Sequence, residues 1–179
     1  MADYDANRSH HTLSVLVENQ PGVLARVAGL FSRRGFNIES LAVGPTERED
    51  RSRITLRVDC SQISIEQVIK QLYKLVNVLK VSEMRQDSTI ERELLLVKVA
   101  ANPDRRAELI SLAGVMDARV VDVGADALVL ELVDHPDKLH AFEELVRPYG
   151  IKEAVRTGRV AVTRIAPTES RRRRLRVLA

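Results

Sequence analysis

The sequence contains few of the residues that catalytic, disulfide-bonded or nucleic-acid-stacking sites require. Among 179 residues there is no tryptophan, only 3% are aromatic, and Cys60 is the single cysteine. One cysteine excludes an internal disulfide and favours a reducing compartment, although a lone cysteine at the end of a strand is most often a small apolar residue. So few aromatic side chains argue against stacking platforms for single-stranded nucleic acid.

Long apolar runs and targeting segments are also missing. No stretch approaches the roughly 20 apolar residues of a membrane span. The N-terminal segment 1–11 is polar, mixed in charge and lacks the apolar centre of a signal peptide. We therefore expect a cytoplasmic protein that does not bind membranes.

Catalytic and metal-binding motifs are absent from the sequence. The chain has no Walker loop, no G-x-G-x-x-G, no H-E-x-x-H and no G-x-S-x-G. His10 and His11 fall in the polar N-terminal arm. His135 and His140 are five positions apart, which rotates them off a common helix face. We expect solvated or capping histidines and no metal site.

Four carboxylates are candidates for acid–base chemistry. Glu91 and Glu93 lie in one short stretch, and Glu143 and Glu144 in another. No second feature marks any two of them as an acid–base pair, so we interpret them as solvated residues or members of ion pairs.

Positive charge is concentrated at the C-terminus. The formal net charge is +3, and Arg171–Arg174 with Arg176 supply more than that excess, with no acid after Glu169. Clustered arginines bind phosphate non-specifically, but the low aromatic content argues against nucleic acid as the function. The alternative is a disordered tail at 167–179 that aids solubility or touches an acidic patch on a partner.

The most informative pattern is an alternating strand followed by one amphipathic helix between two glycines. The alternation over Leu13–Val17 suits a strand with one face on a core. Pro21 is pre-organised for a first helical turn, and Gly35 can take the left-handed conformation that ends the helix. The expected buried side of the helix consists of Val23, Val27, Leu30 and Phe31.

This pattern places a candidate binding site at the start of the helix. Free backbone N–H groups beside Gly22 and the amide of Asn19 could hold a small anion such as a carboxylate. Asn37 begins the next strand, and two amides that flank a helix N-terminus could bind both ends of a free amino acid. The residues alone leave open that Asn19 only caps the helix and Asn37 only forms a turn.

The first half of the chain predicts a β-α-β-β-α-β unit. Pro45–Arg53 suits a hairpin tip, and the alternation over Ile54–Val58 predicts the next strand. Ser64 and Gln67 have capping-box spacing before a second amphipathic helix. The expected buried face of that helix consists of Ile65, Val68, Ile69, Leu72 and Val76, and Val78–Met84 is the closing strand.

A second unit of the same order follows the polar break at Gln86–Thr89. Its expected elements are a strand at Leu94–Ala100, a helix at Asp104–Leu112, a hairpin of Arg119–Val123 and Leu128–Val133, a helix that starts at Asp134 and Pro136 and ends at Gly150, and a last strand at Ile151–Ile165 with a candidate bend at Gly158. The expected buried side of the last helix consists of Leu139, Phe142, Leu145, Val146 and Tyr149.

These patterns predict an α+β protein made of two tandem ferredoxin-like βαββαβ domains. Both helices of such a domain cover one face of an antiparallel sheet, which leaves the other face or an edge for partners. The expected division is a flexible arm at 1–11, domains at 12–85 and 91–166, a linker at 86–90 and the tail. Because small domains bury a smaller fraction of their surface, pairing with another subunit becomes favourable.

The motifs around the first helix closely resemble those of one family. The stretch Leu13–Val43, with Asn19 and Gly22 at the helix start and Gly-Phe-Asn-Ile-Glu-Ser-Leu from Gly35, resembles the amino-acid-binding ACT domain of acetolactate synthase small, regulatory subunits. Gln71–Val76, Val81–Glu83 and Glu91–Val99 resemble the same family, and the resemblance covers roughly residues 10–165.

The resemblance implies a non-catalytic binding subunit. Its partner would be the catalytic large subunit of acetolactate synthase, which carries thiamine diphosphate, magnesium and FAD, so that this chain needs no cofactor of its own. Two ACT domains would pair side by side and bind valine or a related branched-chain amino acid at their interface. The residues that this resemblance assigns to the effector site are Asn19, Gly22, Val23, Leu24, Asn37 and Ile38.

Two other classes of protein stay open at this point. One is a stand-alone amino-acid sensor or gene regulator that uses the arginine tail on nucleic acid. The other is a small enzyme whose second domain is catalytic. Co-purification of a large subunit would favour the regulatory interpretation over both.

Overall fold

A computed structural model describes residues 10–165 of the chain. The elements in chain order are β1 His10–Glu18, α2 Val23–Arg34, β2 Asn37–Pro45, β3 Arg51–Asp59, α3 Ile65–Leu72, β4 Val78–Met84, η1 Gln86–Ser88, β5 Thr89–Ala100, α4 Pro103–Val115, β6 Arg119–Val123, β7 Ala127–Asp134, α5 Pro136–Val146, η2 Arg147–Tyr149, β8 Ile151–Arg156 and β9 Val160–Thr163. The predicted α+β class with two βαββαβ units is confirmed, and we refer to β1–β4 as the N-terminal unit and to β5–β8 as the C-terminal unit.

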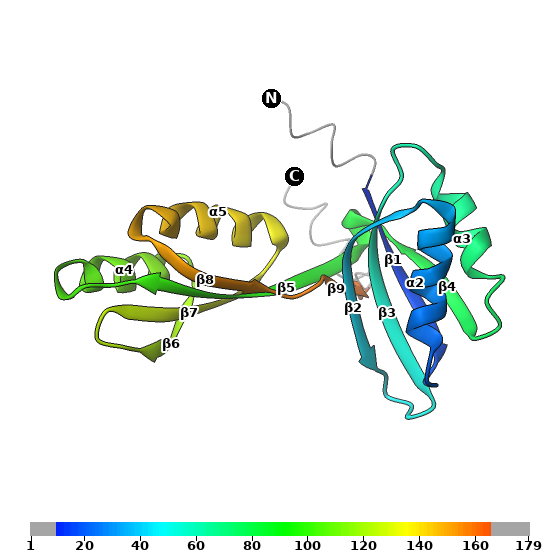
Figure 1. Ribbon diagram of the computed structural model, residues 1–179, viewed down its shortest axis with the longest axis horizontal. Helices are drawn as coiled ribbons and strands as arrows, with labels where there is room; N and C mark the ends of the chain where they lie inside the picture. Colours follow the sequence, from blue (N-terminus) through cyan, green and yellow to red (C-terminus); the bar gives the residue numbers. More distant parts are fainter. Residues whose placement is uncertain (1–9, 166–179) are drawn as a thin grey trace, which may run out of the picture.

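The two units have the same antiparallel strand arrangement. The strand order is β2-β3-β1-β4 in the first sheet and β6-β7-β5-β8 in the second, so the same connectivity occurs twice. Helices α2 and α3 cover one face of the first sheet, and α4 and α5 cover one face of the second (Figure 1). Each unit has its own apolar core: Leu13, Phe31 and Leu56 are among the buried residues of the first, and Leu130, Leu139 and Phe142 of the second.

Local sequence signals account for most helix boundaries. Ser64 accepts a hydrogen bond from the Gln67 N–H and begins α3, as the capping-box spacing predicts. Gly35 has φ 68° and ends α2 in the left-handed conformation, also as predicted. Helix α2 begins at Val23 after Gly22, so Pro21 lies before the first helical residue and not within it.

Several predictions differ from the structure. Strand β5 begins at Thr89, within the segment predicted as a linker, and Leu145 is 44% exposed, so its predicted place on the buried side of the last helix is wrong. The second helix ends at Leu72, and Val76 is 90% exposed, so its predicted place on the buried face is wrong. Strand β1 begins at His10, within the segment predicted as a flexible arm. The candidate bend at Gly158 is confirmed, because the last predicted strand is divided into β8 and β9 around it.

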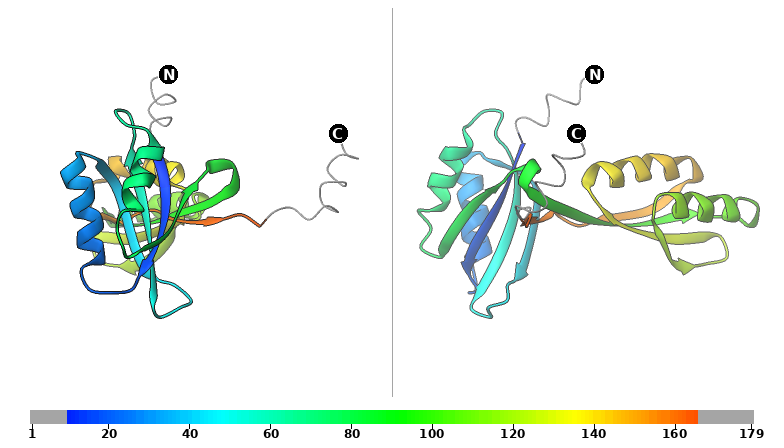
Figure 2. Two further views of the ribbon diagram at one scale, coloured as in Figure 1. Left: turned by 90° about the vertical axis from the view of Figure 1, so that its right-hand side faces the viewer. Right: turned by 180° about the vertical axis from the view of Figure 1, so that it is seen from behind.

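A short two-stranded ribbon lies between the units. The beginning of β5, Thr89–Arg92, pairs with β9 over Val160–Thr163, and the rest of β5 pairs with β7 and β8. Figures 1 and 2 show this ribbon, here called the junction ribbon, between the second sheet and the face of the first sheet that α2 and α3 leave open. The chain therefore returns from the C-terminal unit to the N-terminal unit before it leaves the described residues.

Candidate functional site

The start of α2 is the part of the N-terminal unit best suited to hold an anion. Gly22 precedes the helix with φ 83°, and no side chain caps the first turn. The backbone N–H groups of Leu24 and Ala25 lie in that turn, where an α-helix supplies no acceptor. The Val23 N–H has a long contact of 3.4 Å to the Gln20 carbonyl. A left-handed residue without a side chain therefore leaves a donor-rich helix start open to solvent.

Asn19 holds the loop beside this helix start. Its side-chain N–H donates to the Glu49 carbonyl at 3.0 Å, and its side-chain oxygen accepts from the Ser52 hydroxyl at 3.0 Å. Its backbone N–H donates to the Asp50 carbonyl at 2.8 Å. Gly22, and not Asn19, is the residue that precedes the helix. Asn19 therefore shapes the wall of the site by fixing the β2–β3 loop.

The structure separates the two predicted asparagines within one chain. Asn37 is exposed and begins β2, after α2 has ended at Arg34. The 12 residues of α2 extend over about 18 Å at the rise of an α-helix. The expectation that Asn19 and Asn37 flank the same helix N-terminus is therefore wrong for a single chain.

The three apolar residues of the predicted site have different environments. Val23 is 5% exposed and belongs to the core of the N-terminal unit. Leu24 is 42% exposed at the open helix start. Ile38 packs partly against the same core from the beginning of β2. Only Leu24 and Ile38 thus offer apolar surface to a ligand, and they lie at opposite ends of α2.

A buried polar network fixes the direction of α2. Asn77 is 6% exposed, donates to the Glu18 carboxylate at 2.6 Å and accepts from the Arg26 guanidinium at 2.5 Å. This network joins the end of β1, the second turn of α2 and the loop before β4. Because Asn77 uses both functions of its amide, it connects the start of α2 to the end of β1 and to the loop before β4.

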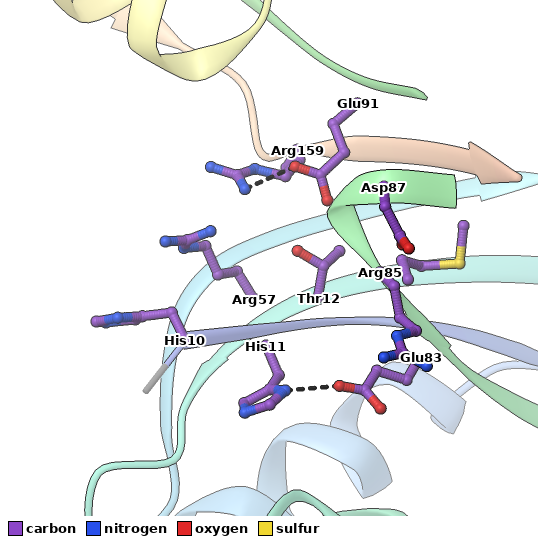
Figure 3. Close-up of a pocket in the computed structure, with 10 residues that line it drawn as sticks. His10, His11, Thr12, Arg57, Glu83, Arg85, Asp87, Glu91 and Arg159 are labelled. Atoms are coloured by element: carbon purple, nitrogen blue, oxygen red, sulfur yellow. Dashed lines mark hydrogen bonds and ion pairs between the residues drawn. The ribbon is translucent and has the colours of Figure 1, made fainter. Parts of the chain in front are cut away.

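A hollow lies at the junction ribbon. Figure 3 shows its side chains, which come from both units and enclose a cavity of about 360 Å³. Its lining residues are His10, His11, Thr12, Arg57, Glu83, Met84, Arg85, Asp87, Glu91 and Arg159. His11 Nδ1 lies 2.7 Å from a Glu83 oxygen, so one of the predicted solvated histidines makes a hydrogen bond between β1 and β4.

The carboxylates of Glu91 and Glu93 are buried, which the sequence analysis did not anticipate as a specific site. They are 5% and 6% exposed, and both contact the guanidinium of Arg159, which is 7% exposed. The interpretation as ion-pair members is correct, whereas a solvated position is wrong. Their i, i+2 spacing in a strand that also buries Leu95 places them on the covered face, which is the signal that could have indicated a buried cation.

Among residues 10–165 no group of three or more His, Cys, Asp or Glu side chains is placed to hold a metal ion. In the same described range no helix has the length and apolar character needed to cross a bilayer. The predicted arginine tail at 167–179 lies outside the described residues and stays a prediction.

Two tandem βαββαβ units, each with its helices on one face of an antiparallel sheet, have the fold of ACT-like domains. Residues 13–80 match the family described as "AHAS small subunit-like ACT domain", and residues 92–165 match "Small subunit of acetolactate synthase". The chain belongs to the acetolactate synthase small-subunit family and shares its regulatory role in branched-chain amino-acid biosynthesis.

Relatives and one solved structure support this assignment over most of the chain. A probable acetolactate synthase small subunit from Archaeoglobus fulgidus is 56% identical over 154 residues, which are 86% of this chain and 96% of the relative. The small subunit from Mycolicibacterium smegmatis is 50% identical over 86% of this chain and 91% of its own length. The crystal structure of the Thermotoga maritima small subunit has TM-score 0.82 at 38% identity and covers 88% of this chain and 99% of that chain.

Proposed function

We propose that two copies of this chain bind valine or a related branched-chain amino acid between their N-terminal units and so inhibit a catalytic large subunit. The observation that supports this proposal best is the uncapped start of α2 after Gly22. Backbone donors there suit the carboxylate common to all amino acids. The remaining contacts of a site for a free amino acid require a second copy, because Asn37 and Ile38 lie at the other end of α2.

The free edge of β2 supports side-by-side pairing of two copies. Strand β2 is at the end of the first sheet, so its outer backbone groups have no strand partner within the described chain. Leu41 and Val43 on β2 and Leu24 on α2 are exposed apolar residues of the same unit. An isologous contact through this edge would pair the backbone and cover these side chains.

Antiparallel pairing of two β2 strands would also assemble the separated residues. Strands β1 and β2 both run antiparallel to β3, so the end of β2 at Pro45 lies on the side of the sheet where β1 ends at Glu18. The helix start at Gly22 follows on that side. In an antiparallel β2 pair, Asn37 of one copy approaches this end of the other copy. One site per helix start would then form, two for each dimer.

The side chains that meet in this arrangement suit a branched aliphatic amino acid. The effector carboxylate would accept hydrogen bonds from the N–H groups in the first turn of α2. The ammonium group of the effector would donate to the side-chain carbonyl of Asn37 from the second copy. Leu24 and Ile38 would contact the branched side chain, since pockets for small ligands are mostly apolar with few placed polar groups.

The rest of the proposal concerns the assembled enzyme. The chain would act without cofactors in the cytoplasm, and thiamine diphosphate, magnesium and FAD would all be held by the catalytic large subunit. A binding subunit accelerates its partner only if it favours the partner's active arrangement, and an effector inhibits only if it binds two arrangements differently.

Reconstitution tests this function directly. We expect no acetolactate synthesis from the purified chain, higher activity of the large subunit when the chain is added, and inhibition of the mixture by valine. Deletion of Ser170–Ala179 serves as a control and should change neither activation nor inhibition. Acetolactate synthesis by the chain alone, in a preparation free of large subunit, would contradict the proposal.

A further inference from the structure

Gly158, between β8 and β9, lies directly against the backbone of the N-terminal unit. A Cβ atom added to Gly158 would lie 2.1 Å from the carbonyl oxygen of Leu41 and 3.0 Å from the N atom of Ala42. Both of these atoms belong to β2. Since no side chain fits in that space, the segment between β8 and β9 lies directly against the strand that begins with Asn37 and Ile38.

The next residue, Arg159, is bonded to both units. Its backbone N–H donates to the hydroxyl of Ser40 on β2 at 2.9 Å. Its guanidinium contacts Glu91 at 2.8 Å and Glu93 at 3.2 Å, both on β5. Figure 3 shows the Arg159–Glu91 pair beside the junction cavity.

The charges around Arg159 balance, and the cluster is connected to the second sheet. Glu93 also accepts from Arg156 at 2.5 Å, so two guanidinium groups balance two carboxylates. Thr157 exchanges hydrogen bonds with the backbone of Leu94 through both its N–H and its hydroxyl, each at 3.0 Å. Separation of the cluster would leave the largely buried charges of Glu91, Glu93 and Arg159 unpaired, which is unfavourable.

We propose that Arg159 is the positioning residue that couples β2 to the C-terminal unit. This inference rests on the proposed function, because β2 carries two of the residues of the proposed effector site. Binding of an effector that shifts β2 would move Ser40 and the backbone at Leu41. The Gly158–Arg159 segment would move with them. The bonds of Arg159 to Glu91 and Glu93 would then transmit that displacement to β5, the central strand of the second sheet.

A rigid connection of this kind differs from a flexible tether. The covalent link through η1 alone would let either unit move without the other. The junction adds a hydrogen bond and a close backbone contact from the Gly158–Arg159 segment to β2, and ion pairs from Arg159 to β5. Physical coupling requires an element whose arrangement both sites can change, and the junction is the candidate for that element.

Two variants of the full-length chain test the coupling. Ser40→Ala removes only the acceptor of the Arg159 N–H. Arg159→Lys keeps the charge but loses the planar group that reaches both carboxylates. Arg106→Lys is the matched control, because that guanidinium donates to the carbonyls of Gly124 and Ala125 inside the C-terminal unit.

Valine affinity of the purified chain and valine inhibition of the reconstituted enzyme are measured separately. We expect both junction variants to bind valine within about twofold of the wild-type affinity, as for sites without shared partners. We expect holoenzymes that contain either junction variant to lose most of their inhibition at saturating valine. In typical allosteric proteins the coupling between two sites changes affinity by about 5- to 150-fold. The Arg106→Lys control should keep both properties.

Amide hydrogen exchange of the full chain gives a readout that does not depend on catalysis. Valine should slow exchange in β2 and β5 of the wild type, but only in β2 of the junction variants. If Arg159→Lys does not fold, Ser40→Ala decides the question alone. Full inhibition and valine-dependent protection of β5 in Ser40→Ala would overturn the coupling role, whereas a wild-type chain that binds no branched-chain amino acid would overturn the proposed function itself.

Discussion

The two units share one connectivity but differ at the start of their first helix. In the N-terminal unit, Gly22 precedes α2 with no capping side chain and no acid in the first turn. In the C-terminal unit, the side chain of Asn102 accepts from the Arg105 N–H at 3.1 Å, Pro103 has no N–H to offer, and Asp104 adds a negative charge. The backbone N–H groups that could bind an anion are thus available at the start of α2. At the start of α4 they are occupied or missing, and Asp104 would repel an anion.

This difference shows how the same fold can bind a ligand in the N-terminal unit and have a structural role in the C-terminal unit. Both helices are stabilised by burial of an apolar face, so neither fold depends on the identity of its first turn. A binding site therefore requires only that the cap be absent and that a neighbouring edge be open. The N-terminal unit meets both conditions, and the following substitutions test the comparison.

The largest effect is expected from a negative charge at the open helix start. Gly22→Asp places a carboxylate where the effector carboxylate would bind, and like charges in contact cost several kcal/mol, equivalent to a loss of affinity of at least about 100-fold. Isothermal titration with valine measures the loss. Gly22→Asn is the matched control, because it has the same shape and the same strain at φ 83° without the charge. Equal losses in both variants would show that strain, and not charge, is responsible.

A smaller loss of affinity is expected from Asn37→Ala. Removal of the amide leaves one polar group of the effector unpaired, which costs about 1–3 kcal/mol or roughly 5- to 150-fold in affinity. The side chain is exposed in one chain, so folding should be unchanged. Calorimetry with unchanged valine affinity would remove Asn37 from the site.

The corresponding substitution in the C-terminal unit should affect stability and not binding. Asn102→Ala removes the cap of α4 and should lower the free energy of unfolding by about 1 kcal/mol. Valine affinity should stay at the wild-type value. Denaturant unfolding and titration of the same preparation measure both quantities. A loss of valine affinity in this variant would show that the two helix starts are not functionally distinct.

The smallest effect is expected from substitutions at the starts of α5 and α3, the second helices of the two units. Their effects on the free energy of unfolding should depend differently on pH. The backbone N–H of His135 and the Lys138 ammonium lower the pKa of Asp134 at the start of α5, whereas an uncharged hydroxyl of Ser64 begins α3. A lowered pKa in the folded state stabilises above the unfolded value of about 3.9 and ceases to do so as pH falls through the folded value.

Asp134→Asn should therefore destabilise by less than about 1 kcal/mol at pH 7 and progressively less below about pH 4. Ser64→Ala should destabilise by about 1 kcal/mol at either pH. Denaturant unfolding followed from pH 7 downward compares the two variants. A cost of Asp134→Asn that does not decrease in acid would contradict the proposed role of the carboxylate.

The sequence correctly predicted those features that depend on residues close together along the chain. The alternation at Leu13–Val17, the cap at Ser64 and the left-handed Gly35 each depend on residues within one or two turns, and the structure confirms all three. The assignment of Val76 to a buried face failed because the helix ended before it. The periodicity of a pattern does not show where a helix leaves the core.

The candidate site was predictable only in part for the same reason. The glycine and the helix start follow from local sequence, whereas the separation of Asn19 and Asn37 follows from the length and direction of α2. The assignment of Asn19, Gly22, Val23, Leu24, Asn37 and Ile38 to an effector site stays a prediction.

The sequence by itself determined the order of the main elements, the cap at Ser64, the helix end at Gly35 and the family of this protein. Only the tertiary structure showed that Glu91 and Glu93 meet Arg159, which is 68 and 66 positions away along the chain. Whether a charge is solvated or buried depends on what packs over it, and no local pattern contains that partner. The connection between the units therefore depends on residues that are far apart along the chain, whereas the elements of each unit follow largely from local sequence patterns.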